Sequence, residues 1–347
     1  MGLVIRVAFA AECATMFGCH APRCPAGLRL FLGVCGLTAA AACHSTDAAT
    51  PTSAAKTIVF VTGPPTGAYN PLGTALADVY ARTIPGVHFT AVAADGPTGA
   101  ASNAAWLEQG KADLAFSRSD IAYLAFRNGV PEDARPYGHL RSMAVLYTNV
   151  VHIMVRRDSG IRRAEDIRGH RVQMPEDPTA SRLTLLVLEA LGLTPQDVQV
   201  RPLLPGAGGS MALRDAEVRV FAAAYPLASI EASGPPGGVR LLSLTPEAVD
   251  HLRSAFPFFK PATIPKGTYT DQDDDLITVG IDGLLLCRDD LPEALVYEMT
   301  RSLFDALPSL ARSQPSARLI NVNRAPTTPI PLHPGAALYY RERDLFR

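Results

Sequence analysis

The stretch TGPPTGAYN, residues 62–70, combines residue types that suit ligand binding at the start of a predicted helix. Its glycines allow backbone N–H groups to approach a ligand, and Tyr69 adds a flat apolar face with one hydroxyl. A helix N-terminus has unpaired N–H groups and partial positive charge, which favour a carboxylate. The stretch could therefore bind a small acid. Considered alone, however, it fits ordinary helix capping beside one packed tyrosine better.

Further loops of the same kind follow strand-like runs. In an open α/β sheet, ligands bind beyond the carboxyl ends of the strands, so these loops should meet at one edge. Six such loops at one edge favour a binding site over six unrelated turns. The other five are ADGPTGAASN (94–103), SRSD (117–120), YTN (147–149), PEDPTASR (175–182) and AYP (224–226).

Two arginines lie at predicted helix starts, Arg118 and Arg182. A cation at this place opposes the helix dipole. An anionic ligand bound by both the guanidinium and the helix N–H groups would explain its position, since arginine can bind a carboxylate through two parallel hydrogen bonds. The alternative is that both reach solvent or pair with Asp120 and Asp177. The ligand role is favoured for Arg118 and the alternative for Arg182. The predicted ligand contacts are Thr62, Gly67, Ala68, Tyr69, Asn70, Arg118, Ser119, Asp120, Tyr147, Asn149, Thr179, Ser181, Arg182 and Tyr225.

Motifs of catalytic and metal sites are missing from the sequence. A hydrolase would need a nucleophile with a base in reach, and neither G-x-S-x-G nor H-E-x-x-H occurs. The eight histidines are scattered, and His152 and His333 are interpreted as structural. The run DQDDD, 271–275, lacks the glycine and distant glutamate of a calcium loop, so a solvated loop fits it better. We expect no catalytic residues, no metal and no cofactor.

The chain has 347 residues, 48% of them hydrophobic, and a formal net charge of −1. This length predicts two domains or one large one, and the charge gives no reason to expect binding to nucleic acid. Residues 29–43, RLFLGVCGLTAAAAC, place a basic residue before a short apolar stretch that ends in small residues. That pattern is typical of a secretory signal, and the alanines before Cys43 resemble a bacterial lipobox.

We therefore predict a lipoprotein-type signal peptide at 1–42, lipidation of Cys43, and a flexible tether at 43–56 that is rich in Ala, Ser and Thr. One alternative is a simple secretory signal with Cys43 unmodified, and Met16 is an alternative start of translation to Met1. Cys287 ends an apolar run and is interpreted as a core residue, so no disulfide is expected.

Strand-like and helix-like stretches alternate along the mature chain, which predicts an α/β architecture with mostly parallel strands. Two long strand-like stretches, 142–156 and 276–287, could each cross between two lobes. We expect lobe 1 at 57–147, lobe 2 at 148–282 and a return to lobe 1 at 283–347. Asn70, Ser119 and Thr245 are the expected helix caps.

Four stretches resemble the TAXI family, the solute-binding receptors of TRAP transporters. They are TGPPTGAYNPLGTALADVY (62–80), GKADLAFSRSDIAY (110–123), PATIPKGTYTDQDDDLITVGI (261–281) and IPLHPGAALYYRE (330–342). The resemblance covers nearly all of 57–342 in the same order. It implies a two-lobed periplasmic-binding-protein fold that closes on a small ligand, commonly glutamate, glutamine or another dicarboxylate-like acid.

Both ligand loops depart from the family pattern. The first lacks the usual pair of glycines and second aromatic residue, Arg118 stands where glutamine is frequent, and residues 177–181 replace a Gly-Ser-Gly-Thr loop. Ligand identity is therefore not carried over. The resemblance predicts a periplasmic lipoprotein that binds a small organic acid between its lobes, delivers it to TRAP permease subunits and is held to the membrane by lipid. The alternatives are a ligand-sensing surface lipoprotein without a transport role and, less favoured, a secreted hydrolase.

Overall fold

The computed structural model describes residues 56–65, 68–94, 99–131, 133–203, 213–227, 229–232 and 237–345. The predicted signal peptide, the lipidation site Cys43, nearly all of the tether and the predicted contact Gly67 lie outside these residues. None of the helices in the described ranges is long and apolar enough to span a bilayer.

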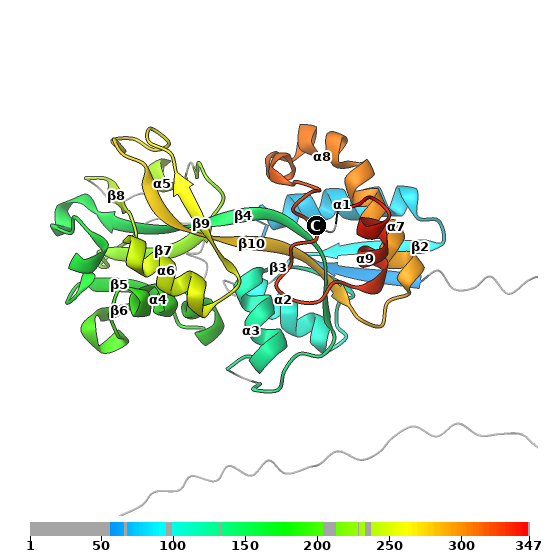
Figure 1. The fold of residues 1–347 in the computed structure, drawn as a ribbon, viewed down its shortest axis with the longest axis horizontal. Coiled ribbons are helices and arrows are strands. Elements are labelled where there is room, and N and C mark those ends of the chain that lie inside the picture. Colours follow the sequence, from blue (N-terminus) through cyan, green and yellow to red (C-terminus); the bar gives the residue numbers. More distant parts are fainter. Residues whose placement is uncertain are drawn as a thin grey trace, which may run out of the picture. The chain divides into compact units, whose positions relative to one another are not determined.

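The described residues form strands and helices in an alternating order (Figure 1). The strands are β1 (Lys56–Val61), β2 (Val87–Val92), β3 (Leu114–Arg118), β4 (Leu140–Arg156), β5 (Arg171–Pro175), β6 (Gln199–Leu203), β7 (Val218–Ala223), β8 (Val239–Leu242), β9 (Phe259–Ile264) and β10 (Leu276–Arg288). The helices are α1 (Tyr69–Thr83), α2 (Gly99–Glu108), α3 (Ser119–Asn128), α4 (Pro178–Ala190), α5 (Ser229–Ala232), α6 (Pro246–Ala255), α7 (Glu293–Asp305), α8 (Leu307–Ser313) and α9 (Pro334–Arg341).

The strands join into one sheet in the order β2-β1-β3-β10-β4-β7-β5-β6, with β8 also on β4 and β9 also on β10. Strand β1 is parallel to β2 and β3, and β5 is parallel to β6 and β7. The long strands β4 and β10 are antiparallel to each other and run side by side through the middle of the sheet (Figure 1). They match the two crossing stretches predicted from the sequence.

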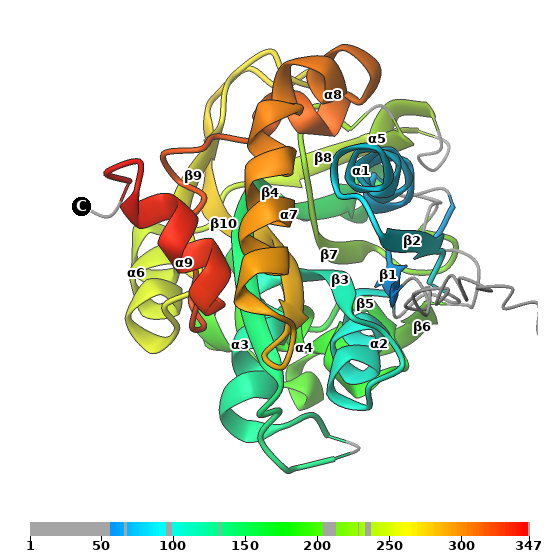
Figure 2. The same ribbon diagram turned by 90° about the vertical axis from the view of Figure 1, so that its right-hand side faces the viewer.

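Different parts of β4 and β10 belong to different hydrophobic cores. We call β1–β3, α1–α3, α7–α9 and the adjoining ends of β4 and β10 the first lobe, and β5–β9 with α4–α6 and the other ends the second lobe. In the first lobe, α1, α7 and α9 pack on one face of the sheet and α2 and α3 on the other (Figure 2). In the second lobe, α4 and α6 cover one face. The predicted lobe boundaries at 147/148 and 282/283 stay a prediction.

Helix capping was predicted correctly at one of three positions. Thr245 caps α6 by accepting a hydrogen bond from the Ala248 amide at 3.1 Å. Asn70 is instead inside α1, where its amide donates to the Thr62 hydroxyl at 3.1 Å. Ser119 is the first residue of α3, and its hydroxyl accepts from the backbone amide of Asp282 on β10 at 3.1 Å. The Asn70 side chain thus binds Thr62, directly after β1, and the Ser119 side chain binds β10, so neither caps its own helix.

Three further interpretations agree with the structure. Cys287 is fully buried in the first lobe's core, and burial raises the pKa of its thiol. His333 caps α9 by accepting from the Gly335 amide at 3.2 Å. In the acidic run, Asp271 pairs with Arg157 at 3.0 Å and is largely exposed. The described residues contain no group of three or more His, Cys, Asp or Glu side chains arranged to hold a metal ion.

Candidate ligand-binding site

Tyr69, at the start of α1, lies where the first lobe meets the crossing strands. Its ring packs against Phe116 and Tyr147, with centroids 5.1 and 6.0 Å away, and its hydroxyl donates to the Ser117 carbonyl at 3.3 Å. On β10, a Cβ added to Gly283 would lie 2.6 Å from that hydroxyl, so only glycine leaves room for it. Burial raises the pKa of Tyr69, which keeps the hydroxyl protonated as a donor at neutral pH.

Arg118 and Asp120 form a two-bond ion pair at the start of α3. Arg118 Nε lies 3.0 Å from Asp120 Oδ1, and Nη2 lies 2.6 Å from Oδ2. The side chains are 20% and 2% exposed, so the carboxylate is shielded and the guanidinium partly open. Burial lowers the pKa of Arg118, but the charge and hydrogen bonds of Asp120 outweigh this and raise it above its ordinary value. The pair is therefore charged on both sides and neutral as a unit.

Several other predicted contacts are engaged in holding the fold. The Thr62 hydroxyl donates to the Val92 carbonyl at 3.1 Å, and the Ser181 hydroxyl donates to the Pro178 carbonyl at 3.0 Å. Tyr147 and Asn149 on β4 are buried. Ala68 is exposed just before α1. Tyr225 is half-buried and packs against the second lobe's smaller core.

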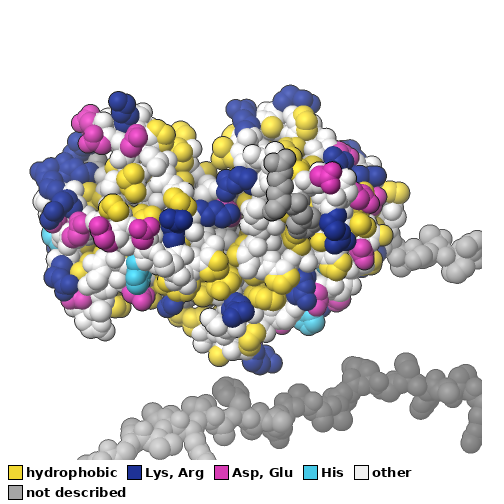
Figure 3. Space-filling model, in the orientation of Figure 1, with side chains coloured by type: hydrophobic (Ala, Val, Ile, Leu, Met, Phe, Trp, Pro, Cys, Tyr) yellow, Lys and Arg dark blue, Asp and Glu magenta, His cyan; other side chains and the backbone are white. Residues whose placement is uncertain are grey.

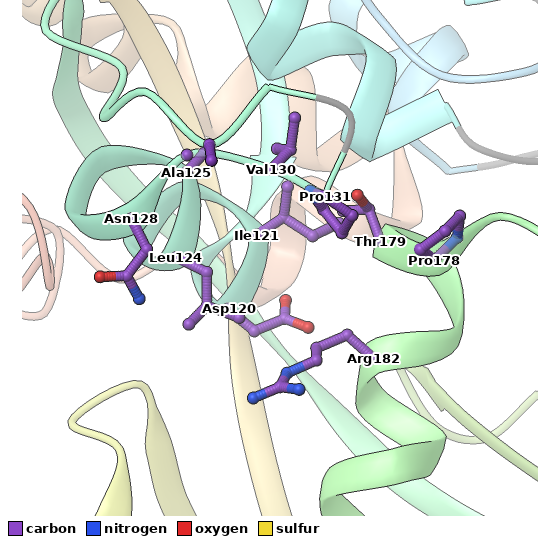
Figure 4. A pocket seen from close by; sticks show the side chains of 12 residues that line it. Asp120, Ile121, Leu124, Ala125, Asn128, Val130, Pro131, Pro178, Thr179 and Arg182 are labelled. Atoms are coloured by element: carbon purple, nitrogen blue, oxygen red, sulfur yellow. The ribbon is translucent and has the colours of Figure 1, made fainter.

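A pocket of about 300 Å³ lies between α3 of the first lobe and the start of α4 in the second (Figure 4). It brings together three predicted contacts, Asp120, Thr179 and Arg182, which come from both lobes. The remaining lining is mostly apolar. It consists of Ile121, Leu124, Ala125, Asn128, Gly129, Val130, Pro131, Ala134 and Pro178. Tyr69, Tyr147 and Asn149 do not line this pocket.

Arg182 extends into the pocket from α4 and is exposed (Figure 4). Its expected ion-pair partner Asp177 caps α4 instead, because Asp177 Oδ1 accepts from the Ala180 amide at 2.7 Å. Arg182 forms no ion pair with any carboxylate in the described part of the chain. Arg118 thus forms the ion pair that was the less favoured alternative for it, whereas Arg182 is exposed as its favoured alternative allowed and is also the cation available at the pocket.

Sequence reasoning missed a buried charge cluster beside this site. Asp282 on β10 is 1% exposed, and its carboxylate accepts from the Thr148 hydroxyl at 2.7 Å and from Arg324 at 3.3 Å. It also binds Lys260 of β9. The signal was available, since an aspartate inside the apolar run LITVGIDGLLLC must be paired if it is buried. No spacing in the sequence points to Lys260 or Arg324.

The histidines described in the lobe cores do not offer a base to the pocket. His152 is 2% exposed, and its ring nitrogens contact the Val150 carbonyl at 2.8 Å and the Tyr269 hydroxyl at 2.9 Å. Burial lowers the pKa of His152 to about 4, so it is neutral at pH 7. The chemistry that the pocket residues support is noncovalent binding by one guanidinium, one hydroxyl, the Asn128 amide and otherwise mostly apolar walls.

Comparison with solved structures confirms the predicted two-lobed α/β fold of the periplasmic-binding-protein type. A Xanthomonas citri protein bound to ATP has a TM-score of 0.52 at 14% identity, and the match covers 84% of this chain and 100% of that one. MatC from Rhodopseudomonas palustris, with bound malate, has a TM-score of 0.51 at 14% identity over 84% and 99% of the two chains. Residues 60–343 match the NMT1-like family, which is most of the sequence. The chain therefore belongs to the NMT1-like family.

Proposed function

We propose that the protein is an extracytoplasmic solute-binding protein that takes a small organic anion between its lobes and delivers it to a membrane transporter. The observation that carries this proposal is the pocket between α3 and α4, which is built from both lobes and contains the accessible cation Arg182. A ligand held there would bind the two lobes at once. Separately from this pocket, Lys and Arg side chains gather over β4 where the surface is hollowed between the lobes, above α3 in the view of Figures 1 and 3.

An anionic solute also agrees with the ligands of the similar structures, since malate and ATP are both anions. The first lobe would contribute the α3 side of the pocket, and the second lobe would contribute Thr179 and Arg182. Because only a closed form would satisfy both sets of contacts, the ligand would shift the protein toward closure by its differential affinity for the two states. The ligand would leave unchanged, as expected for a protein that is not an enzyme.

The finer proposal is a TAXI-type receptor of a TRAP transporter in the periplasm, anchored through lipid on Cys43. One acyl chain binds membranes only marginally, so stable anchoring needs several. Replacing Cys43 with Ala should release the protein into the soluble fraction. If the wild-type protein is already soluble on fractionation, the anchor is refuted. Genes for TRAP membrane subunits beside this gene would favour transport, whereas their absence would favour the sensing alternative.

Native mass spectrometry followed by calorimetry tests the binding function directly. A retained small acid should be observed in the purified protein and should rebind after removal. Thr179→Ala should weaken binding by about 1–3 kcal/mol, because the ligand's polar group would be left buried and unpaired. Thr90→Ala, at an exposed position on β2, is the matched control. Small-angle scattering should show a smaller radius of gyration with ligand, and chemical conversion of the ligand would refute the proposal in favour of an enzyme.

A further inference from the structure

We infer that the pocket between α3 and α4 selects a monoanion with an apolar body, such as a monocarboxylate or monosulfonate, and discriminates against dianions. The inference rests on the proposed function and specifies its substrate class. It differs from the dicarboxylate-like ligand that the sequence resemblance implies. Three features of the pocket carry it: its charge, its walls and the way in which α4 is capped.

The charge of the pocket matches one anionic group. Asp120 and Arg182 are the charged residues among the described lining, and both Asp120 oxygens are engaged by Arg118 at 3.0 and 2.6 Å. The Arg118–Asp120 pair is neutral as a unit, so Arg182 contributes one uncompensated positive charge. Figure 4 shows Asp120 and Arg182 approaching the same space from facing helices. A second carboxylate would find no further uncompensated cation among the described lining residues.

The start of α4 offers little to a second anion. Asp177 already accepts from the Ala180 amide through its side chain and from the Ser181 amide through its carbonyl, at 2.7 and 2.9 Å. Pro178 has no N–H group. In the first turn, Thr179 therefore supplies the remaining amide and a hydroxyl. Both lie one helical turn before Arg182, so they would bind the same anionic group as the guanidinium.

Apart from the exposed Asn128, the remaining walls favour an apolar ligand body. Ile121 and Ala125 are buried, and Leu124 and Val130 are partly exposed toward the pocket with Pro131. A carboxylate buried against such side chains loses its hydration without gaining a partner, which is strongly unfavourable. Apolar atoms buried there are stabilised instead. A volume of about 300 Å³ lies at the lower end of small-molecule sites and suits a compact ligand.

Calorimetry on the full chain with three probes of equal carbon number tests the inference. The probes are hexanoate, adipate and hexanol, which carry one, two and no carboxylates. We expect hexanoate to bind at least tenfold more tightly than either of the others. Its affinity should rise about fourfold per added methylene in the series from butyrate to hexanoate. Adipate binding as tightly as hexanoate would overturn the inference, as would the absence of binding by all three probes.

Variants of Arg182 test whether its guanidinium binds the anionic group of the ligand. Arg182→Gln should reduce hexanoate affinity at least tenfold, and Arg182→Lys should restore part of it. Arg127→Gln, at an exposed position on α3 outside the lining, is the control and should leave affinity unchanged. Circular dichroism verifies that each variant is folded. Unchanged hexanoate binding in Arg182→Gln would overturn the inference. Tight binding of a dianion would leave the proposed function intact, whereas conversion of a bound solute would refute that function.

Discussion

Replacing Gly283 with alanine should destabilise the protein because the new methyl group would collide with Tyr69. The added Cβ would lie 2.6 Å from the Tyr69 hydroxyl oxygen and 3.4 Å from ring atoms Cε1 and Cζ. The tyrosine has little freedom to move, since Phe116 and Tyr147 pack against its ring and its hydroxyl is bonded to the Ser117 carbonyl. Tyr69→Phe removes the colliding oxygen and should therefore rescue the Gly283→Ala variant.

The expected magnitudes follow from these contacts. Overpacking of this kind costs about 1–3 kcal/mol. Tyr69→Phe alone loses one neutral hydrogen bond, which is long at 3.3 Å, and should cost about 0.5–1.5 kcal/mol. In the double variant the nearest atoms are ring carbons at 3.4 Å, so its stability should be close to that of Tyr69→Phe. The double variant should therefore be about 1–2 kcal/mol more stable than the sum of the two single effects would give.

Urea unfolding followed by far-UV circular dichroism measures all four members of this cycle by linear extrapolation. Gly138→Ala is the matched control, because a Cβ at Gly138 meets nothing within 4 Å. It should be as stable as the wild type within about 0.5 kcal/mol. The reasoning is refuted if Gly283→Ala is as stable as this control, or if the two changes in the double variant are simply additive.

Three further changes probe other parts of the fold. Burial lowers the pKa of His152 from 6.5 to about 4, so the unfolded state binds more protons than the folded state as pH falls from 6.5 toward 4. The unfolding free energy should therefore fall by about 2 kcal/mol between pH 7 and pH 5. Urea unfolding of His152→Gln at the two pH values should not show this fall. Asp282→Asn should lower the unfolding free energy by about 1–3 kcal/mol, because it weakens the buried cluster of Asp282 with its three partners. The control Asp158→Asn removes an exposed ion pair and should lower it by less than about 1 kcal/mol in the same assay. Gly335→Ala should lower stability by about 3 kcal/mol or more, since its Cβ would lie 2.2 Å from the Glu293 carbonyl, and a melting temperature equal to wild type would contradict this.

Elements with strong local signals were predictable from the sequence. The start of α6, which is Pro246–Ala255, is predicted correctly, because the threonine cap at Thr245 and a proline in the first position define it. The crossing strands are predicted at 142–156 and 276–287 from long, strand-like and mainly apolar stretches, and they are Leu140–Arg156 and Leu276–Arg288. Strand β9 was missed, since Pro261 within it argues against a strand. It pairs along β10, with Pro261 opposite Val279.

The candidate site was less predictable because its contacts depend on partners distant in sequence. Asp282 meets Lys260 and Arg324 across separations of 22 and 42 residues, and no spacing rule connects them. Tyr69 was identified as a contact from its loop, yet its neighbours Phe116 and Tyr147 come from strands that only the sheet order places beside it. The residue types of a binding site were therefore visible in the sequence, whereas the apolar wall that α3 of the first lobe contributes to the pocket was not.

The two arginines show what decides between ion pairing and an accessible charge at a helix start. Arg118 is followed two residues later by Asp120, whose carboxylate takes both hydrogen bonds of the guanidinium. The nearest acid before Arg182 in α4 is Asp177, but it precedes a proline at the first helical position and caps the helix through the Ala180 amide. A capping carboxylate is already stabilised by the backbone and the helix dipole, so it gains little by turning to a nearby cation. An arginine in the first turn after an aspartate–proline cap is thus left to solvent or to a ligand, and this rule could have been applied to the sequence directly.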